Sequence, residues 1–172
     1  FNNTKPRTFK LFGSLGRAAF AVSSILAVQS TASAAFVELH LEQFTYNNGP
    51  STPPGTTTWR LYAEFDDPND QLTRVHGDAP YFSLCYATGG FYQNPFGGST
   101  SLHNNSAFWP MIPSLAYDSY VTIGGEHSYE SQTLSSTGID FTMFEGGGPL
   151  LFQNGEWTRP QNDPYAFGEV LS

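Results

Sequence analysis

The chain has 172 residues, a formal net charge of −8 and an aromatic content of 16%. All 15 acidic residues follow residue 34, whereas only three of the seven basic residues do, so residues 35–172 carry a net charge of 3 − 15 = −12. Such a chain repels phosphate backbones and anionic membrane surfaces, which argues against nucleic acid or a charged bilayer as its partner.

The first 34 residues have the order of a secretory signal peptide. Basic residues come first, the short apolar run 18–28 follows, and the small residues Ala32, Ser33 and Ala34 end the segment. Signal peptidase recognises this order, and the apolar run is shorter than the roughly 20 residues that span a bilayer. We therefore predict that residues 1–34 are removed. Residues 35–172 would then form one domain without a transmembrane segment, secreted or held at the cell surface.

Two runs of alternating apolar and polar residues predict the first two strands. Residues 36–44 alternate, and so do residues 57–65. A period of two places every second side chain on the same face of a sheet. The side chains expected to face inward in the second run are Trp59, Leu61, Ala63 and Phe65.

The rest of the chain is expected to form short strands between turns rich in glycine and proline. Strands are predicted at residues 71–77, 81–88, 114–124, 139–144 and 150–152, and one helical turn is predicted at residues 106–112. Loops are predicted at residues 47–56, 89–105, 126–137 and 155–164.

No segment after residue 34 has a convincing helical period. This pattern predicts an all-β fold, an antiparallel β-sandwich of jelly-roll or Greek-key type. Residues 165–172 resemble the start of a further strand, so we expect the domain to be truncated at its C-terminal end.

An acidic turn is the candidate metal site. Four oxygen-bearing side chains fall within five positions: Asp66, Asp67, Asn69 and Asp70. Calcium takes several oxygen ligands from such loops, although the glycine and the distal glutamate of an EF-hand are absent. A solvated turn between two strands explains the same residues, so calcium is one of two interpretations.

The segment from residue 89 to residue 112 carries aromatic rings beside amide side chains. The candidate ligand-binding residues are Tyr92, Gln93, Asn94 and Trp109. Rings stack on the CH faces of neutral sugars and amides bind hydroxyl groups, which favours a glycan site. The alternative is that these rings close one end of the sandwich as part of its core.

The sequence assigns no catalytic residue. Gly-x-Ser-x-Gly is absent, Cys85 is expected to be a buried apolar residue, and the histidines lack metal-ligand spacing. The histidines are His40, His76, His103 and His127. Two carboxylates could form the acid and base of a glycoside hydrolase, but only the fold decides which of them meet. The candidates are Glu64, Asp118, Glu126 and Glu145.

Three segments resemble a recurring module of unassigned function found in secreted, mostly marine bacterial and environmental proteins. They are residues 59–65 (WRLYAEF), 91–98 (FYQNPFGG) and 113–124 (PSLAYDSYVTIG). The resemblance covers roughly residues 36–172, with one departure at Tyr120, where the module commonly has tryptophan. It implies an extracellular β-rich module and brings no known activity, catalytic residue or cofactor.

These observations favour a non-catalytic secreted or cell-surface module with a structural or binding role. Its partner would be an extracellular glycan or a surface protein. The alternative is a secreted hydrolase that acts on polysaccharide through a carboxylate pair.

Overall fold

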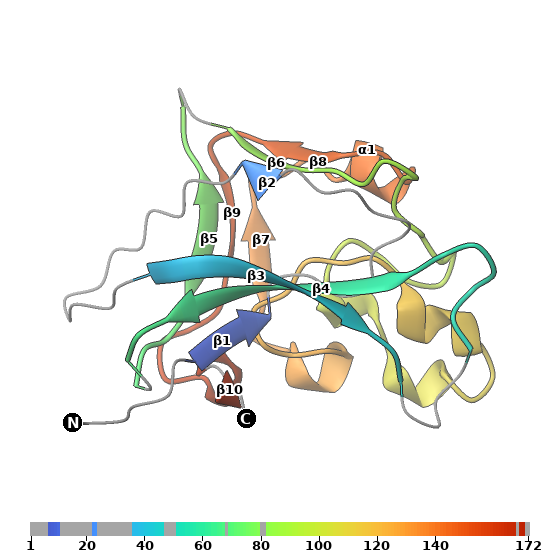
Figure 1. Cartoon of the computed structure of the whole chain (residues 1–172), viewed down its shortest axis with the longest axis horizontal. Coiled ribbons are helices and arrows are strands. Elements are labelled where there is room, and N and C mark those ends of the chain that lie inside the picture. Colours follow the sequence, from blue (N-terminus) through green and yellow to red (C-terminus); the bar gives the residue numbers. More distant parts are fainter. Residues whose placement is uncertain are drawn as a thin grey trace.

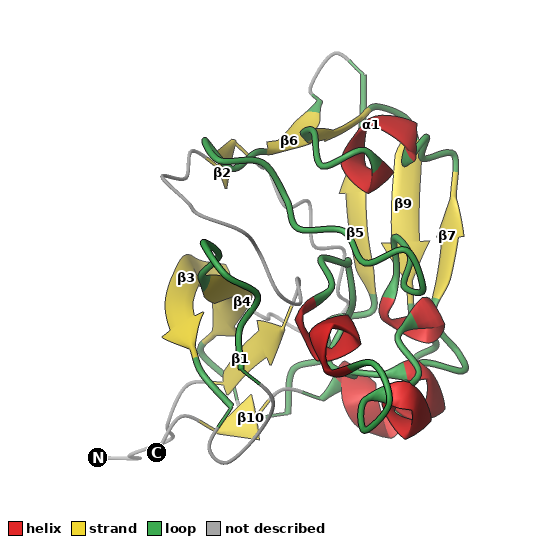
Figure 2. Cartoon of the chain, turned by 90° about the vertical axis from the view of Figure 1, so that its right-hand side faces the viewer, coloured by secondary structure: helices red, strands yellow, loops and turns green. Residues whose placement is uncertain are grey.

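The computed structural model describes residues 7–10, 22–23, 36–46, 51–67, 69–79, 82–167 and 169–170. The regular secondary structure of the described residues is mostly antiparallel strand, which confirms the prediction of an all-β fold. The first sheet has the order β10-β1-β4-β3 and contains β10 (Glu169–Val170), β1 (Arg7–Lys10), β4 (Thr58–Phe65) and β3 (Phe36–Phe44). In Figure 2 this sheet lies on one side of the molecule.

Two smaller sheets complete the β structure. One contains β2 (Val22–Ser23), β6 (Ser83–Cys85) and β8 (Leu150–Phe152). The other contains β5 (Arg74–Gly77), β9 (Gly155–Thr158) and β7 (Ser135–Thr137). Figure 1 shows β6 and β8 above the long β3–β4 hairpin, with β5, β9 and β7 crossing behind it. The jelly-roll or Greek-key order of a sandwich stays a prediction.

The helical elements are short and lie between the strands. Among the residues that the structure describes, the single α-helix is α1 (Thr142–Glu145). The 3-10 turns are η1 (Ser101–His103), η2 (Ser106–Phe108), η3 (Pro113–Tyr117), η4 (Ser128–Glu130) and η5 (Pro164–Ala166). None of the helices among the described residues is long and apolar enough to cross a membrane.

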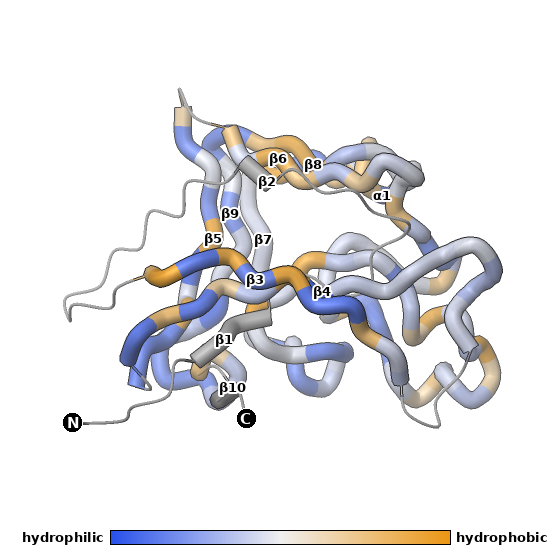
Figure 3. The backbone as a smooth tube through the Cα atoms, in the orientation of Figure 1, coloured by the Kyte–Doolittle hydropathy of each residue, from blue (hydrophilic) through white to orange (hydrophobic). Residues whose placement is uncertain are grey.

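One hydrophobic core is shared by all three sheets. It joins the inward side chains of β4 to Cys85 of β6, Phe152 of β8 and Trp157 of β9. Figure 3 shows the same pattern along the chain, because β6 and β8 are mostly hydrophobic whereas β3 alternates. The predicted inward residues of β4 are in the core, with Trp59 packed at its margin. Burial of these apolar surfaces is the main favourable contribution to folding.

The segment 114–124, predicted to be a strand, is irregular. Pro113 begins the 3-10 turn η3, and the described pairing of the remaining residues is a single bridge between Thr100 and Val121. Every residue from 115 to 123 is buried, so both sets of alternating positions face protein. The alternation of apolar and polar residues therefore did not predict the structure of this segment, because its buried positions include polar side chains that form hydrogen bonds with the backbone of loops.

Three other predictions near the C-terminal end were wrong. Residues 135–137, expected within a loop, form the strand β7. Residues 142–144, the end of the strand expected at residues 139–144, form α1 together with Glu145, because the side chain of Asp140 accepts a hydrogen bond from the Thr142 N–H at 2.9 Å and starts a helical turn. Residues 155–158, expected within a loop, form β9. This strand is central in its sheet, and its Trp157 is only 1% exposed.

The predicted leader, residues 1–34, lies outside the described residues except for β1 and β2. β1 pairs with β4 and β10, and β2 pairs with β6. The predicted boundary after Ala34 falls two residues before the first residue of β3. At the other end, the expected further strand corresponds in part to β10, while residues 168, 171 and 172 are outside the described part.

Candidate functional site

One long irregular segment, residues 89–125, holds all four predicted ligand-binding residues. It contains η1, η2 and η3, and Figure 1 shows these turns gathered beside one end of the β3–β4 hairpin. Asp118 is its single Asp, Glu, Lys or Arg residue, and this side chain is fully buried. The segment therefore presents an uncharged surface on an otherwise acidic protein.

Asp118 fixes the turn that contains Asn94. One carboxylate oxygen accepts a hydrogen bond from the Asn94 N–H at 2.7 Å, and the other accepts one from the Gly98 N–H at 2.9 Å. A Cβ atom at Gly97 would lie 1.8 Å from the second oxygen, so no larger residue fits this position. A buried carboxyl group that receives two backbone donors acts as an anchor for the loop around it.

The environment of Asp118 also changes its acidity. Burial raises the pKa of Asp118 to about 7, and Glu145 acts in the same direction, against the lowering effect of the backbone N–H groups of Asn94, Gly98 and Ser119. A carboxyl group with such a pKa suits general acid catalysis near neutral pH. Asp118 is fully enclosed, however, and both of its oxygens bind the loop backbone, so its observed role is to position the segment.

The two predicted amide ligands are engaged inside the protein. Asn94 is 6% exposed; its amide nitrogen donates to the Ser114 hydroxyl at 2.9 Å and its amide oxygen accepts from the Phe96 N–H at 3.0 Å. The amide nitrogen of Gln93 donates to the Phe144 carbonyl at 2.8 Å. The Gln93 amide oxygen is buried without a hydrogen-bond partner. These amides hold the loop together rather than point to solvent.

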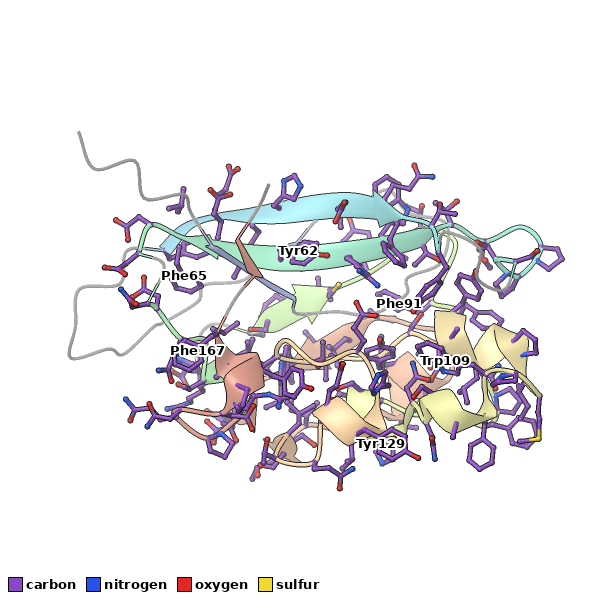
Figure 4. All side chains as sticks on the ribbon, turned by 90° about the horizontal axis from the view of Figure 1, so that it is seen from below. Tyr62, Phe65, Phe91, Trp109, Tyr129 and Phe167 are labelled. Carbon is purple, nitrogen blue, oxygen red and sulfur yellow. The ribbon has the colours of Figure 1, made fainter. Side chains whose placement is uncertain are left out.

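The two predicted ring ligands are half-buried. The indole N–H of Trp109 donates to the side-chain oxygen of Asn104 at 2.9 Å, and its ring meets Tyr46 and His127 edge-on at centroid distances of 5.9 and 6.0 Å. The hydroxyl of Tyr92 accepts from the Asn94 amide at 3.4 Å. Figure 4 shows Trp109 turned toward the body of the protein and Tyr129 on its outer side.

The large side chains that solvent reaches near residues 89–125 are not the predicted ligand residues. Phe96 is 66% exposed, Phe108 46%, Met111 69% and Tyr129 64%. None of these four residues is among the ligand residues predicted from the sequence, although Phe96 and Phe108 belong to the same aromatic segment. The available signal was the turn sequence around Phe96, where glycine and proline neighbours leave a ring without strand partners.

An ion pair joins the β3–β4 hairpin to the segment that follows residue 125. A guanidinium nitrogen of Arg60 lies 2.7 Å from a carboxylate oxygen of Glu126. The same guanidinium stacks on the Phe44 ring, 3.2 Å from its centroid. The hydroxyls of Tyr46 and Tyr62 contact the same guanidinium, and burial raises the pKa of each to about 12, so both remain protonated. Glu126, one of the four candidate acids, is therefore used in a structural pair.

The arginines as a group were missed as structural residues. All three that follow residue 34 form ion pairs: Arg60 with Glu126, Arg74 with Glu156, and Arg159 with Asp163. The sequence feature that could have indicated this role is the small number of arginines among many carboxylates, because each arginine then has several possible acidic partners. The most buried is Arg159, whose guanidinium also donates to the Glu130 carbonyl at 2.9 Å.

The acidic turn proposed as a calcium site is hydrogen-bonded within itself. One side-chain oxygen of Asp67 accepts from the backbone and the amide of Asn69, at 2.8 and 3.1 Å. The Asp70 N–H donates to the Asp67 carbonyl, and burial raises the pKa of Asp70. Among the residues that the structure describes, no three His, Cys, Asp or Glu side chains are grouped as metal ligands. The calcium site stays a prediction.

The remaining candidate groups lie on several elements, and one of them, Glu145, acts electrostatically on Asp118. Glu64 lies opposite Glu38 in the β3–β4 pair, and Glu145 is exposed at the end of α1. The Nε2 atom of His127 lies 3.5 Å from a carboxylate oxygen of Glu130. Cys85 is buried as expected, and burial raises the pKa of its thiol to about 12, which keeps it in the unreactive protonated form.

Comparison with known proteins gives no match to a family model, to a curated protein or to a solved structure.

Proposed function

We propose that the protein is a non-catalytic, secreted or cell-surface binding module that binds a neutral extracellular glycan on residues 89–125. The observation that carries this proposal is an uncharged segment with the exposed rings of Phe96 and Phe108, within a protein that is otherwise acidic. Exposed apolar surface of this kind is typical of interaction sites.

The charge distribution favours a neutral ligand over an anionic one. Residues 35–172 have a net charge of −12, so the field around the domain repels acidic polysaccharides and nucleic acids. The faces of a neutral sugar ring that carry CH groups are apolar and pack on aromatic rings. Because Asn94 and Gln93 are used internally, we expect the rings to supply most of the binding energy.

A glycan array with the purified chain tests the proposal, followed by titration calorimetry on the best ligand. Phe96→Ala and Phe108→Ala should each weaken binding about tenfold, which corresponds to about 1.4 kcal/mol. Both rings are exposed, so neither change should lower the melting temperature much. Met143→Ala is the matched control, because Met143 is 60% exposed and lies on α1, outside the segment.

The array also decides between the kinds of partner. Absence of binding to any neutral glycan would refute the proposed ligand, and a surface protein would then be the partner to seek. Tyr92→Ala separates the two interpretations of that ring. Weaker glycan binding at unchanged stability would make it a contact residue, whereas a large loss of stability would make it part of the core.

A polysaccharide hydrolase is the second candidate function, favoured by the raised pKa of Asp118. A substrate would reach this carboxyl group only after the turn around Asn94 had moved, since both carboxylate oxygens bind that turn. Release of reducing sugar from a panel of polysaccharides, lost in Asp118→Asn, would support the enzyme.

A further inference from the structure

Strand β3 lies at the outer edge of its sheet. Among the described residues it pairs only with β4, and Figure 2 shows it as the outermost strand. It is nine residues long and mostly exposed, with Val37 at 51%. A long edge strand presents a row of N–H and C=O groups to which another strand can add.

The regular part of this edge is shorter than the strand. The register between β3 and β4 shifts between Phe36 and Glu38, which marks a bulge. A bulge twists the backbone and interrupts strand pairing. The regular edge therefore covers residues 38–44, and the residue at its midpoint is Leu41.

We propose that two copies of this chain associate by antiparallel pairing of their β3 strands about a two-fold axis at Leu41. In an antiparallel pair, opposed residues both point their backbone groups toward the partner or both away from it. In a pair related by a two-fold axis, odd-numbered residues therefore lie opposite odd-numbered residues and even-numbered residues opposite even-numbered ones. The axis consequently lies at a residue, where that residue faces its own copy, and not between two residues. The candidates near the centre of the strand are Leu39, His40 and Leu41.

Charge selects among these three axes. An axis at Leu41 places His40 opposite Glu42 of the second copy, twice by symmetry, and an axis at His40 places Glu38 opposite Glu42. Opposed like charges destabilise a strand pair, whereas a ring N–H of His40 can donate to the Glu42 carboxylate. An axis at Leu39 also pairs histidine with glutamate, but it brings the bulge into the interface.

The neighbours of these side chains within one copy leave the edge open. His40 lies beside Tyr62 of β4, with ring centroids 6.5 Å apart, and Glu42 lies opposite Arg60, with its carboxylate accepting a hydrogen bond from the Tyr62 hydroxyl. Both side chains are exposed. The association would use a surface separate from residues 89–125, so it does not rest on the proposed glycan site.

Cysteine pairing in the full chain tests the axis. His40→Cys and Glu42→Cys are purified separately, mixed under mild oxidation, and analysed by non-reducing electrophoresis and mass spectrometry. We expect a disulfide between position 40 of one copy and position 42 of the other in the mixture, with little product from either variant alone. Buried Cys85 should not react. Ser135→Cys mixed with Thr137→Cys gives the background for another exposed strand, β7.

Three outcomes would overturn the proposal. Efficient crosslinking of His40→Cys with itself would place the axis at His40, and a stronger product between Glu38→Cys and His40→Cys would place it at Leu39. A mixture with no more product than the β7 background, together with a monomeric mass in sedimentation equilibrium, would exclude the association. Melting curves of each variant establish that it is folded.

Discussion

Replacing Asp118 by asparagine should change how stability depends on pH. Burial raises the pKa of this carboxyl from 3.8 in the unfolded chain to about 7 in the fold. Between these values the folded chain holds a proton that the unfolded chain has released. The free energy of unfolding therefore falls as pH rises from about 4 to about 7. At 1.36 kcal/mol per pKa unit, a difference of roughly 3 units corresponds to about 4 kcal/mol.

Urea unfolding of the wild type and Asp118→Asn at several pH values between 4 and 8 measures this contribution. Other titrating groups are common to both proteins, so the difference between their curves isolates Asp118. We expect the wild type to lose about 4 kcal/mol relative to the variant across this range. A difference that is flat, or that grows in favour of the wild type with pH, would refute the reasoning. The donors from Asn94 and Gly98 would then outweigh burial. Should the variant not fold, the carboxyl carbon resonance of Asp118 gives its pKa directly.

Three further predictions concern Gly97, Arg159 and the acidic turn. Gly97→Ala should destabilise the fold by about 2 kcal/mol or more in urea unfolding, because its Cβ would lie 1.8 Å from an Asp118 oxygen. Arg159→Met should cost about 3–5 kcal/mol in the same assay, since it leaves Asp163 without its buried partner; an unchanged midpoint would contradict this. If the acidic turn binds calcium, the melting temperature should rise in CaCl2 relative to EDTA, and Asp67→Asn should abolish the rise.

The strands with one solvated face were the part of the fold that the sequence could predict. β3 and β4 alternate because one face of their hairpin meets the core and the other meets solvent or loops. Even here Tyr62, which alternates with the inward residues of β4, is only 8% exposed, because the side chains of Arg60 and Glu42 lie against it on the outer face. β9 was missed because Gly155, Pro160 and Pro164 made its surroundings look like a turn, although Trp157 is one of the most buried side chains.

The candidate site could be predicted only as a region. Residues 89–112 were predicted to carry rings beside amides, whereas residues 114–124 were predicted to be a strand, and the sequence does not say which side chains point outward. That choice is made by contacts between residues far apart in the chain, such as Asp118 with Gly98 and Gln93 with Phe144. Such contacts leave no periodic signal, because each is a single hydrogen bond and not part of a repeating ladder.

The same contacts explain how an irregular segment can present a defined surface. Residues 89–125 form only one β-bridge, so regular backbone pairing contributes little to their order. Buried polar groups replace it: Asp118 receives two loop N–H donors, and Asn104 accepts from the Trp109 indole. A hydrogen-bonded buried polar group is costly to release, which holds the loop in one conformation. Rings displayed on a loop fixed in this way lose little freedom on binding, so a few exposed side chains such as Phe96 and Phe108 can suffice for a ligand.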